Sequence, residues 1–135
     1  MAQNKAYLGL DVGEVRIGVA LADDKVRIAI PYGVVQATDD VQRAIAKLVV
    51  DHDITTIVIG YPRNQSGEKT AQTNYVEEFA ASIKDIADNI VFQDESLTSV
   101  MAEDRLRARQ KDYQKEDIDA EAATIILQDY LELNR

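Results

Sequence analysis

The hydrophobic and polar positions of the chain follow two periods, and the change between them divides the sequence. Near the amino end, residues 5–12 and 16–22 are short apolar runs rich in β-branched side chains, separated by Gly13 and Glu14. A third run, 26–35, follows a turn-like segment at 22–25. Apolar runs joined by tight turns are typical of hairpins. This part of the chain therefore predicts three sequential antiparallel strands, and Pro31 predicts an edge strand or a bulge in the third.

After residue 37 the apolar positions recur at helical spacing. Thr38 is the predicted N-cap of a helix whose apolar stripe comprises Val41, Ile45, Leu48 and Val49. Residues 55–60 form a continuous apolar strand of the kind that is buried on both faces. A loop at 61–68 leads to a long amphipathic helix, whose apolar stripe comprises Val76, Phe79, Ala80, Ile83, Ile86 and Ala87. A fifth strand at 90–93 and helices at about 98–110 and 117–133 complete the pattern.

This order of elements predicts the fold class. Three sequential strands followed by alternating helices and strands indicate an α/β fold with a five-stranded mixed sheet, three antiparallel strands and then two parallel ones. Helices are expected on both faces of that sheet. With 135 residues, the chain is predicted to form a single domain, residues 1–135, that is large enough to bury a sizeable core.

Three acidic residues stand where predicted elements begin or end. Asp11 closes the first apolar run, Glu95 follows the fifth strand, and Asp119 opens the last helix. Alternation along the strands places Asp11 on the face of Gly9, which would leave open space beside the acid. Because two or three carboxylates suffice to hold Mg²⁺, and paired ions can clamp a phosphodiester, the pattern predicts a metal-dependent nuclease.

Asp119 carries most of this hypothesis. It shares a helical stripe with Ala122, Ala123 and Ile126, so it is expected to face the core, where an acid is costly unless a partner compensates its charge. A metal ion would be such a partner. Other interpretations stay open: Asp11 could form a turn, Glu95 could be a solvated acid, and Asp119 could be an N-cap.

Charge and composition modify the nuclease hypothesis. The formal net charge is −9, with 24 acidic residues against 15 basic ones, which argues against strong nonspecific attraction to a polyanion. A local basic run is either a phosphate-binding surface or a solvated helix face, and it comprises Arg105, Arg107, Arg109, Lys111 and Lys115. The chain has no cysteine, no long apolar span and no signal-peptide pattern, so a cytoplasmic location is expected.

Four segments, in order along nearly the whole chain, resemble motifs of the YqgF/RuvX family of ribonuclease H-like proteins. LGLDVGEVRIGVALAD is similar to D-x-G-x-x-x-I-G-V-A, and IVIGYPRNQSG to G-L-P-x-N-x-x-G. DESLTSVMAE is similar to D-E-R-L-[ST]-T-x-x-A. DIDAEAATIILQDYL is similar to V-D-x-x-A-A-x-x-I-L-x-x-Y-L. Four motifs in the right order make the resemblance specific.

The resemblance implies a ribonuclease H-like fold and a hydrolase that cuts phosphodiesters with Mg²⁺ or Mn²⁺. Asp11, Glu95 and Asp119 take the positions of the acidic catalytic and metal-binding triad. The implied role is endonucleolytic processing of the 5′ end of pre-16S ribosomal RNA in ribosome biogenesis, with branched DNA as a further substrate for a monomer or homodimer. Arg16, Asn64 and Thr98 match supporting polar positions of the family. The residues expected to bind nucleic acid are these three, the basic run, and Arg63 and Lys69, whose charges lie near the motif loops.

Three departures from the family pattern bear on substrate binding. Ser96 replaces the usual Arg, Glu14 replaces Thr or Ser, and Glu116-Asp117 replaces a Gly-Lys pair, so the local charge becomes more negative. Weaker RNA binding is expected as a result. The first alternative is therefore a noncatalytic nucleic-acid-binding module in transcription or ribosome assembly. A less favoured alternative is an actin-like or sugar-kinase-like ATPase, which would need a second domain to close over the nucleotide.

Overall fold

The chain folds around one mixed five-stranded sheet. The computed structural model describes residues 5–62, 69–95, 98–109 and 112–134. The strands are β1 (Ala6–Val12), β2 (Arg16–Asp23), β3 (Ile30–Gln36), β4 (Thr56–Pro62) and β5 (Asn89–Glu95), in the order β3-β2-β1-β4-β5. The β3-β2-β1 pairings are antiparallel and the β1-β4-β5 pairings are parallel. The predicted mixed sheet is confirmed.

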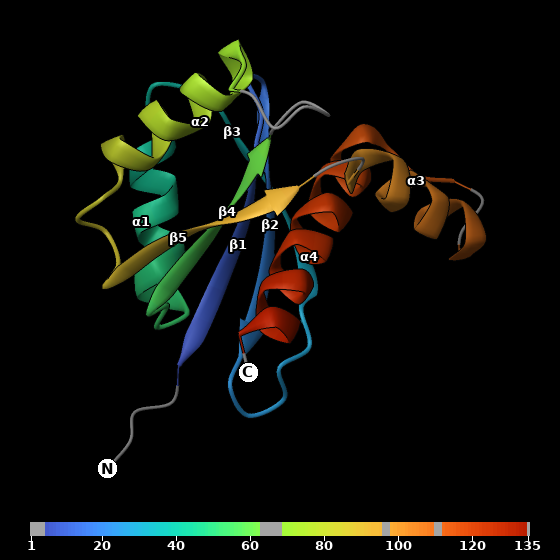
Figure 1. Cartoon of the computed structure of the whole chain (residues 1–135), viewed down its shortest axis with the longest axis horizontal. Helices are drawn as coiled ribbons and strands as arrows, with labels where there is room; N and C mark the ends of the chain where they lie inside the picture. The colour runs from blue at the N-terminus through green and yellow to red at the C-terminus, as the bar shows by residue number, and fades with distance from the viewer. Residues whose placement is uncertain (1–4, 63–68, 96–97, 110–111, 135) are drawn as a thin grey trace.

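Helices cover both faces of this sheet, as predicted. Figure 1 shows α1 (Val41–Asp51) and α2 (Ala71–Ser82) on one side and α4 (Lys115–Leu133) on the other, with α3 (Thr98–Arg109) outside α4. Leu8 and Leu10 of β1 pack in the core under α1 and α2. Tyr7 and Val58 pack against α4. The predicted alternation of β1 is confirmed, because Tyr7 and Leu8 belong to different cores.

Several local predictions also hold. β3 lies at the edge of the sheet, and its pairing with β2 shifts register opposite Pro31, as its place in the third run predicted. Proline lacks the N–H that a central strand would need, which explains both features. The buried residues of α1 are the predicted stripe, Val41, Ile45, Leu48 and Val49.

Other boundaries were predicted wrongly. Asp40, not Thr38, is the N-cap of α1. β4 continues to Pro62 because Tyr61 is buried and its ring lies 4.9 Å from that of Phe92 on β5. β5 in turn continues to Glu95, because its parallel pairing with β4 extends that far. α2 ends at Ser82, whose hydroxyl donates to the Phe79 carbonyl at 2.6 Å and so competes with the helical backbone bonds.

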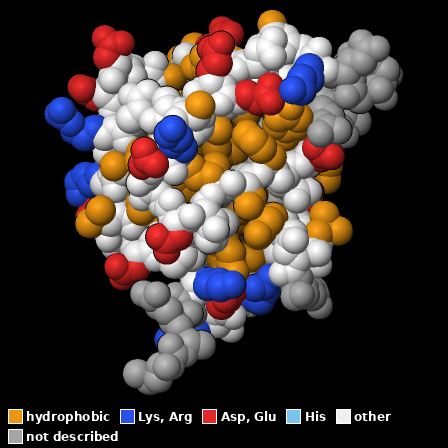
Figure 2. All heavy atoms as spheres, turned by 60° about the vertical axis from the view of Figure 1, so that its left-hand side comes forward, with side chains coloured by type: hydrophobic (Ala, Val, Ile, Leu, Met, Phe, Trp, Pro, Cys, Tyr) orange, Lys and Arg blue, Asp and Glu red, His pale blue; other side chains and the backbone are white. Residues whose placement is uncertain are grey.

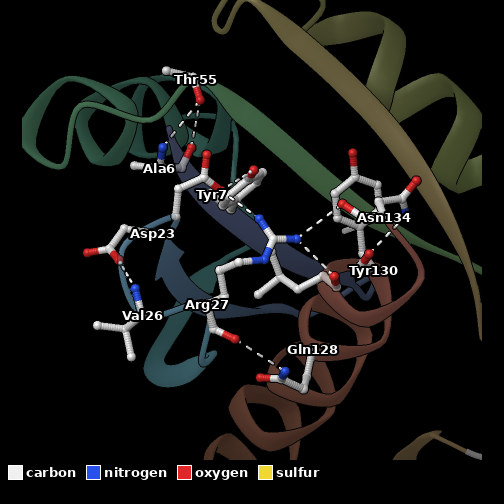
Figure 3. Close-up of polar contacts among 11 residues, drawn as sticks. Ala6, Tyr7, Asp23, Val26, Arg27, Thr55, Gln128, Tyr130 and Asn134 are labelled. Carbon is white, nitrogen blue, oxygen red and sulfur yellow. Dashed lines mark hydrogen bonds and ion pairs between the residues drawn. The ribbon is translucent and has the colours of Figure 1, made fainter. Parts of the chain in front are cut away.

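The carboxyl end of α4 is fastened to the connection between β2 and β3 (Figure 3). Arg27 adopts a positive φ of 58°, and its guanidinium donates to the carbonyls of Leu131 at 2.9 Å and Asn134 at 3.1 Å. Gln128 accepts a hydrogen bond from the Ala29 backbone at 2.8 Å. A cation at the carboxyl end of a helix suits the helix dipole. The contact fixes where α4 lies along β2.

Candidate active site

Asp11 lies near the carboxyl end of β1 and faces α4. It pairs across the β1–β2 ladder with Gly18, and paired residues in a sheet face the same side. Burial raises the pKa of the Asp11 carboxyl to about 6, and the negative charge of Asp119 adds to the rise. No described residue donates a hydrogen bond to this carboxylate. Asp11 is therefore a half-buried acid whose nearby charge is of the same sign.

Gly18 explains how Asp119 of α4 comes close to β2 and so to Asp11, the residue that pairs with Gly18. A Cβ at Gly18 would collide with the backbone carbonyl of Asp119, so only glycine lets this turn of α4 rest on β2. The helix begins at Lys115 with Gln114 as its N-cap, and Asp117 completes a capping box. Asp119 consequently lies in the second turn, and the N-cap interpretation of this residue is wrong.

Arg16 is the partner of Asp119. Its Nε donates to Asp119 Oδ2 at 2.7 Å, and the same Nε lies 3.9 Å from Glu116 Oε1. The hydrogen bond to Asp119 is the main reason that the pKa of Arg16 is raised. The sequence suggested that a metal ion would compensate the inward-facing acid. In this structure Arg16 provides that compensation. The local sequence pattern could not reveal it, because the two residues lie 103 positions apart.

Glu95 lies on the face of the sheet that α4 covers, on the edge strand β5. It is the last residue of β5, not a residue beyond it. Glu95 lies four residues after Val91, so the two face the same side of the strand, and Val91 packs in the core beneath α4. A Cβ added at Gly60 would lie 3.0 Å from Glu95 Cδ and 2.6 Å from Ile126 of α4. Glu95 thus lies above Gly60, at the carboxyl ends of the parallel strands where Asp11 also lies.

Gly9 does not provide the open space that was predicted beside Asp11. A Cβ at this position would lie 2.7 Å from the Leu127 Cβ, because α4 packs directly on the glycine. The space is used for helix packing. The prediction failed because a strand pattern alone does not reveal which helix will cover a glycine.

Comparison with known proteins identifies the family. The family model described as "RuvX: Holliday junction resolvase" matches residues 5–133. The chain belongs to the RuvX family. It is 41% identical over 137 residues to a Chloroflexus aggregans protein named "Putative pre-16S rRNA nuclease", covering 97% of this chain and 96% of the relative. It is also 39% identical over 140 residues to a Synechocystis protein of the same name, covering 100% and 92%.

Solved structures confirm the ribonuclease H-like fold. Thermus thermophilus RuvC in complex with a Holliday junction aligns with a TM-score of 0.57 at 12% identity, covering 96% of this chain and 94% of RuvC. The Fowlpox virus resolvase, in a complex with Holliday junction DNA, aligns with a TM-score of 0.57 at 12% identity, covering 96% and 99%. At this identity the likeness concerns the fold alone.

The carboxylates of this RuvX protein suit a hard cation in their chemistry. Asp11 and Asp119 are oxygen donors whose mutual repulsion a cation would relieve, and Mg²⁺ often takes one or two carboxylates plus waters and substrate phosphates. Over the described residues, however, no group of three or more Asp, Glu, His or Cys side chains is arranged to hold a metal ion. The structure therefore supplies an adjacent pair, with Glu95 on the same face, and not an assembled set of three ligands.

The predicted nucleic-acid-binding residues are mostly engaged with acids. Glu121 is 2% exposed and lies 2.7 Å from Arg109 and 3.6 Å from Arg105, so these two arginines anchor α3 to α4. Arg107 lies 3.4 Å from Glu103 and 3.5 Å from Asp104. The basic run is thus partly an internal ion-pair system, not an open cationic surface. Sequence reasoning missed Glu121, whose signal is a single acid within the apolar run AEAATIIL.

The remaining predicted residues have varied positions. Lys69 pairs with Glu77 at 3.3 Å, and Lys115 is exposed at the first position of α4. Arg63, Asn64 and Lys111 lie outside the described residues. Thr98 begins α3.

A hollow beside Asp119 offers room for a substrate. It encloses about 540 Å³, and its lining includes Arg16 and Asp119 on one side and Gln72 and Tyr75 of α2 on the other. Tyr75 escaped the sequence analysis, although it is spaced i, i+4 from Phe79 on the apolar side of α2. A larger hollow of about 740 Å³, lined by His52 and Ile54 among others, lies at the opposite ends of β1 and β2. The smaller hollow is therefore the one that borders the candidate site.

Proposed function

We propose that this chain is a metal-dependent endonuclease that processes the 5′ end of pre-16S ribosomal RNA, acting as one ribonuclease H-like domain over residues 1–135. The observation that carries the proposal is the pair Asp11 and Asp119 at the carboxyl end of β1, in a member of the RuvX family. The names of the relatives supply the substrate. That substrate implies a cytoplasmic location. Among the described helices, none is long and apolar enough to cross a membrane.

Each residue has a distinct role in this proposal. Asp11 and Asp119 would hold Mg²⁺ or Mn²⁺, with Glu95 as the third acid from the same face. The cation would polarise the phosphodiester and lower the pKa of a bound water. Arg16 and the hollow along α2 orient the RNA strand. Burial, and then the charge of Asp119, raise the pKa of Asp11, and a cation between the two acids would favour the ionised carboxylate.

A direct test is cleavage of a 5′-extended 16S RNA fragment by the purified protein in Mg²⁺, in Mn²⁺ and in EDTA. Asp11→Asn, Asp119→Asn and Glu95→Gln should each lower the cleavage rate by at least about a hundredfold, because each removes a proposed ligand. Asp94→Asn is the matched control, since Asp94 neighbours Glu95 on β5 and alternates to the other face. Unchanged rates in all three ligand variants would refute the assignment.

One observation favours a second candidate, the noncatalytic nucleic-acid-binding module. Asp119 is already neutralised by Arg16, and the described acids form no group of three that would hold a metal. This candidate predicts RNA binding without cleavage in either cation. Because the chain belongs to the RuvX family, the ATPase alternative is no longer needed. Action on branched DNA and a homodimeric state remain proposals, which a junction-cleavage assay and sedimentation analysis would test.

A further inference from the structure

Arg16 stands between two acids of α4. Its Nε is 2.7 Å from Asp119 Oδ2 and 3.9 Å from Glu116 Oε1. Asp119 and Glu116 are three residues apart, so they lie on the same side of the helix, one turn apart. Within the described part of the chain, these are the two acids at ion-pair distance from Arg16. Both acids therefore lie within ion-pair distance of the same guanidinium nitrogen.

The closer of these two acids is the one that a cation needs. Under the function proposed above, Asp119 and Asp11 would share a divalent cation, and the positive charge of Arg16 opposes its approach. A cation that draws Asp119 toward Asp11 leaves the guanidinium of Arg16 without its hydrogen-bonded partner. The Arg16 side chain is 22% exposed, so water compensates that loss only in part.

We propose that Arg16 is a positioning residue with two states, bound to Asp119 without metal and to Glu116 with metal, and that Glu116 thereby sets the cation affinity of the site. The proposal rests on the nuclease function proposed above. Glu116 is suited to the second state because its side chain is 52% exposed, and so it can move to meet Arg16. It also offsets the charge of Arg16 when Asp119 no longer does.

The test is a double-mutant cycle read out by Mn²⁺ binding to the protein without RNA, measured by titration calorimetry. Arg16→Gln should tighten Mn²⁺ binding by about fivefold, and Glu116→Gln should weaken it by about fivefold. In the Arg16→Gln background, Glu116→Gln should change the dissociation constant by less than about twofold, because its partner is gone. Arg16→Met, which also removes the charge and keeps an unbranched side chain, takes its place in the cycle if Arg16→Gln unfolds.

The matched control is Glu14→Gln, which removes a negative charge from the lining of the same hollow. It should change Mn²⁺ affinity by less than about twofold in both backgrounds. An equal effect of Glu116→Gln with and without Arg16 would mean that Glu116 acts through space, and this would overturn the proposal.

A second readout follows the arginine itself. The NMR signal of the Arg16 Nε proton, assigned by its absence in Arg16→Gln, should move during a Mg²⁺ titration and remain protected from exchange. In Glu116→Gln it should exchange rapidly once Mg²⁺ is bound. A signal that Mg²⁺ leaves unchanged would overturn the two-state behaviour of Arg16. If the wild-type protein and Arg16→Gln both fail to bind Mn²⁺, the metal site itself is refuted. If Asp11→Asn abolishes Mn²⁺ binding but the cycle is additive, the metal site stands and only the proposed role of Glu116 is refuted.

Discussion

Asp11 makes the protein without metal less stable as the pH rises. Burial and Asp119 raise its pKa to about 6 from 3.8, so between these values the folded protein binds a proton more tightly than the unfolded chain does. Stability is therefore lost as pH rises through this window, and the loss is complete above it. At neutral pH the fold keeps this carboxylate ionised in surroundings that favour its neutral form, and such perturbed groups are common at functional sites.

We expect Asp11→Asn to stabilise the protein in EDTA by up to about 3 kcal/mol at pH 7.5, and by almost nothing at pH 4. Urea unfolding at both pH values measures the difference. Asp39→Asn, which removes an exposed acid before α1, controls for the loss of one negative charge. A gain of the same size at pH 4 and pH 7.5 would assign the effect to packing and not to ionisation.

At the level of elements, the position of α4 depends on glycines in the sheet. We expect Gly18→Ala to destabilise the protein by about 1–3 kcal/mol and to lower metal-dependent cleavage, because its Cβ would push Asp119 away from Asp11. Gly9→Ala is the comparison, since it meets α4 at Leu127, about two turns further along. Both variants should lose stability, as thermal melts would show.

Cleavage well below both melting temperatures separates the two variants. Gly18→Ala should lose more activity than Gly9→Ala, because only the former displaces the turn that carries Asp119. Equal activity in the two variants would show that the glycine contacts support the fold without setting the geometry of the acids.

The contact between α3 and α4 depends on a buried acid. Arg105→Ala combined with Arg109→Ala should cost about 3–5 kcal/mol, because it leaves the Glu121 carboxylate buried without a charged partner. Adding Glu121→Gln should recover part of that loss. Arg107→Ala, which removes an exposed side chain paired with Glu103 and Asp104, should cost no more than about 1 kcal/mol. Urea unfolding measures all four proteins, and a double variant as stable as Arg107→Ala would contradict the anchoring role.

The sequence predicted these elements better than their contacts. The stripe of α1 and the alternation of β1 were predicted correctly because each depends on neighbours within a few residues. The Arg16–Asp119 and Arg109–Glu121 pairs escaped prediction because the partners belong to different elements. Strand ends were misjudged for a similar reason: Glu95 belongs to β5 only because its pairing with β4 continues to Pro62.

At the scale of the whole molecule, acidic residues outnumber basic ones. On the face seen in Figure 2, Lys and Arg side chains are scattered among acidic ones around a band of hydrophobic side chains, and they form no broad basic patch. The net charge is −9, and several arginines are held in ion pairs. A polyanion therefore gains little from this surface unless a cation bridges it to the acids.

We expect a short single-stranded RNA to bind at least about tenfold more weakly in EDTA than in Ca²⁺ at equal ionic strength. Fluorescence anisotropy measures both affinities. Asp11→Asn should remove the dependence on Ca²⁺, and Asp39→Asn should keep it. Equal binding of the wild-type protein in the two buffers would locate the RNA away from the carboxylates.

The two arginines that hold α4 also bear on when the site forms during synthesis. Arg16 begins β2 and Arg27 follows it, and they contact α4 near its beginning and at its end. A growing chain contains Asp11 and Arg16 about a hundred residues before Asp119 is made. The sheet can therefore be complete while the acidic site still lacks a member. Docking of α4 closes contacts between residues more than a hundred positions apart and brings Asp119 to Asp11 in the same event. Under the proposed function, cleavage would therefore begin only after α4 has docked.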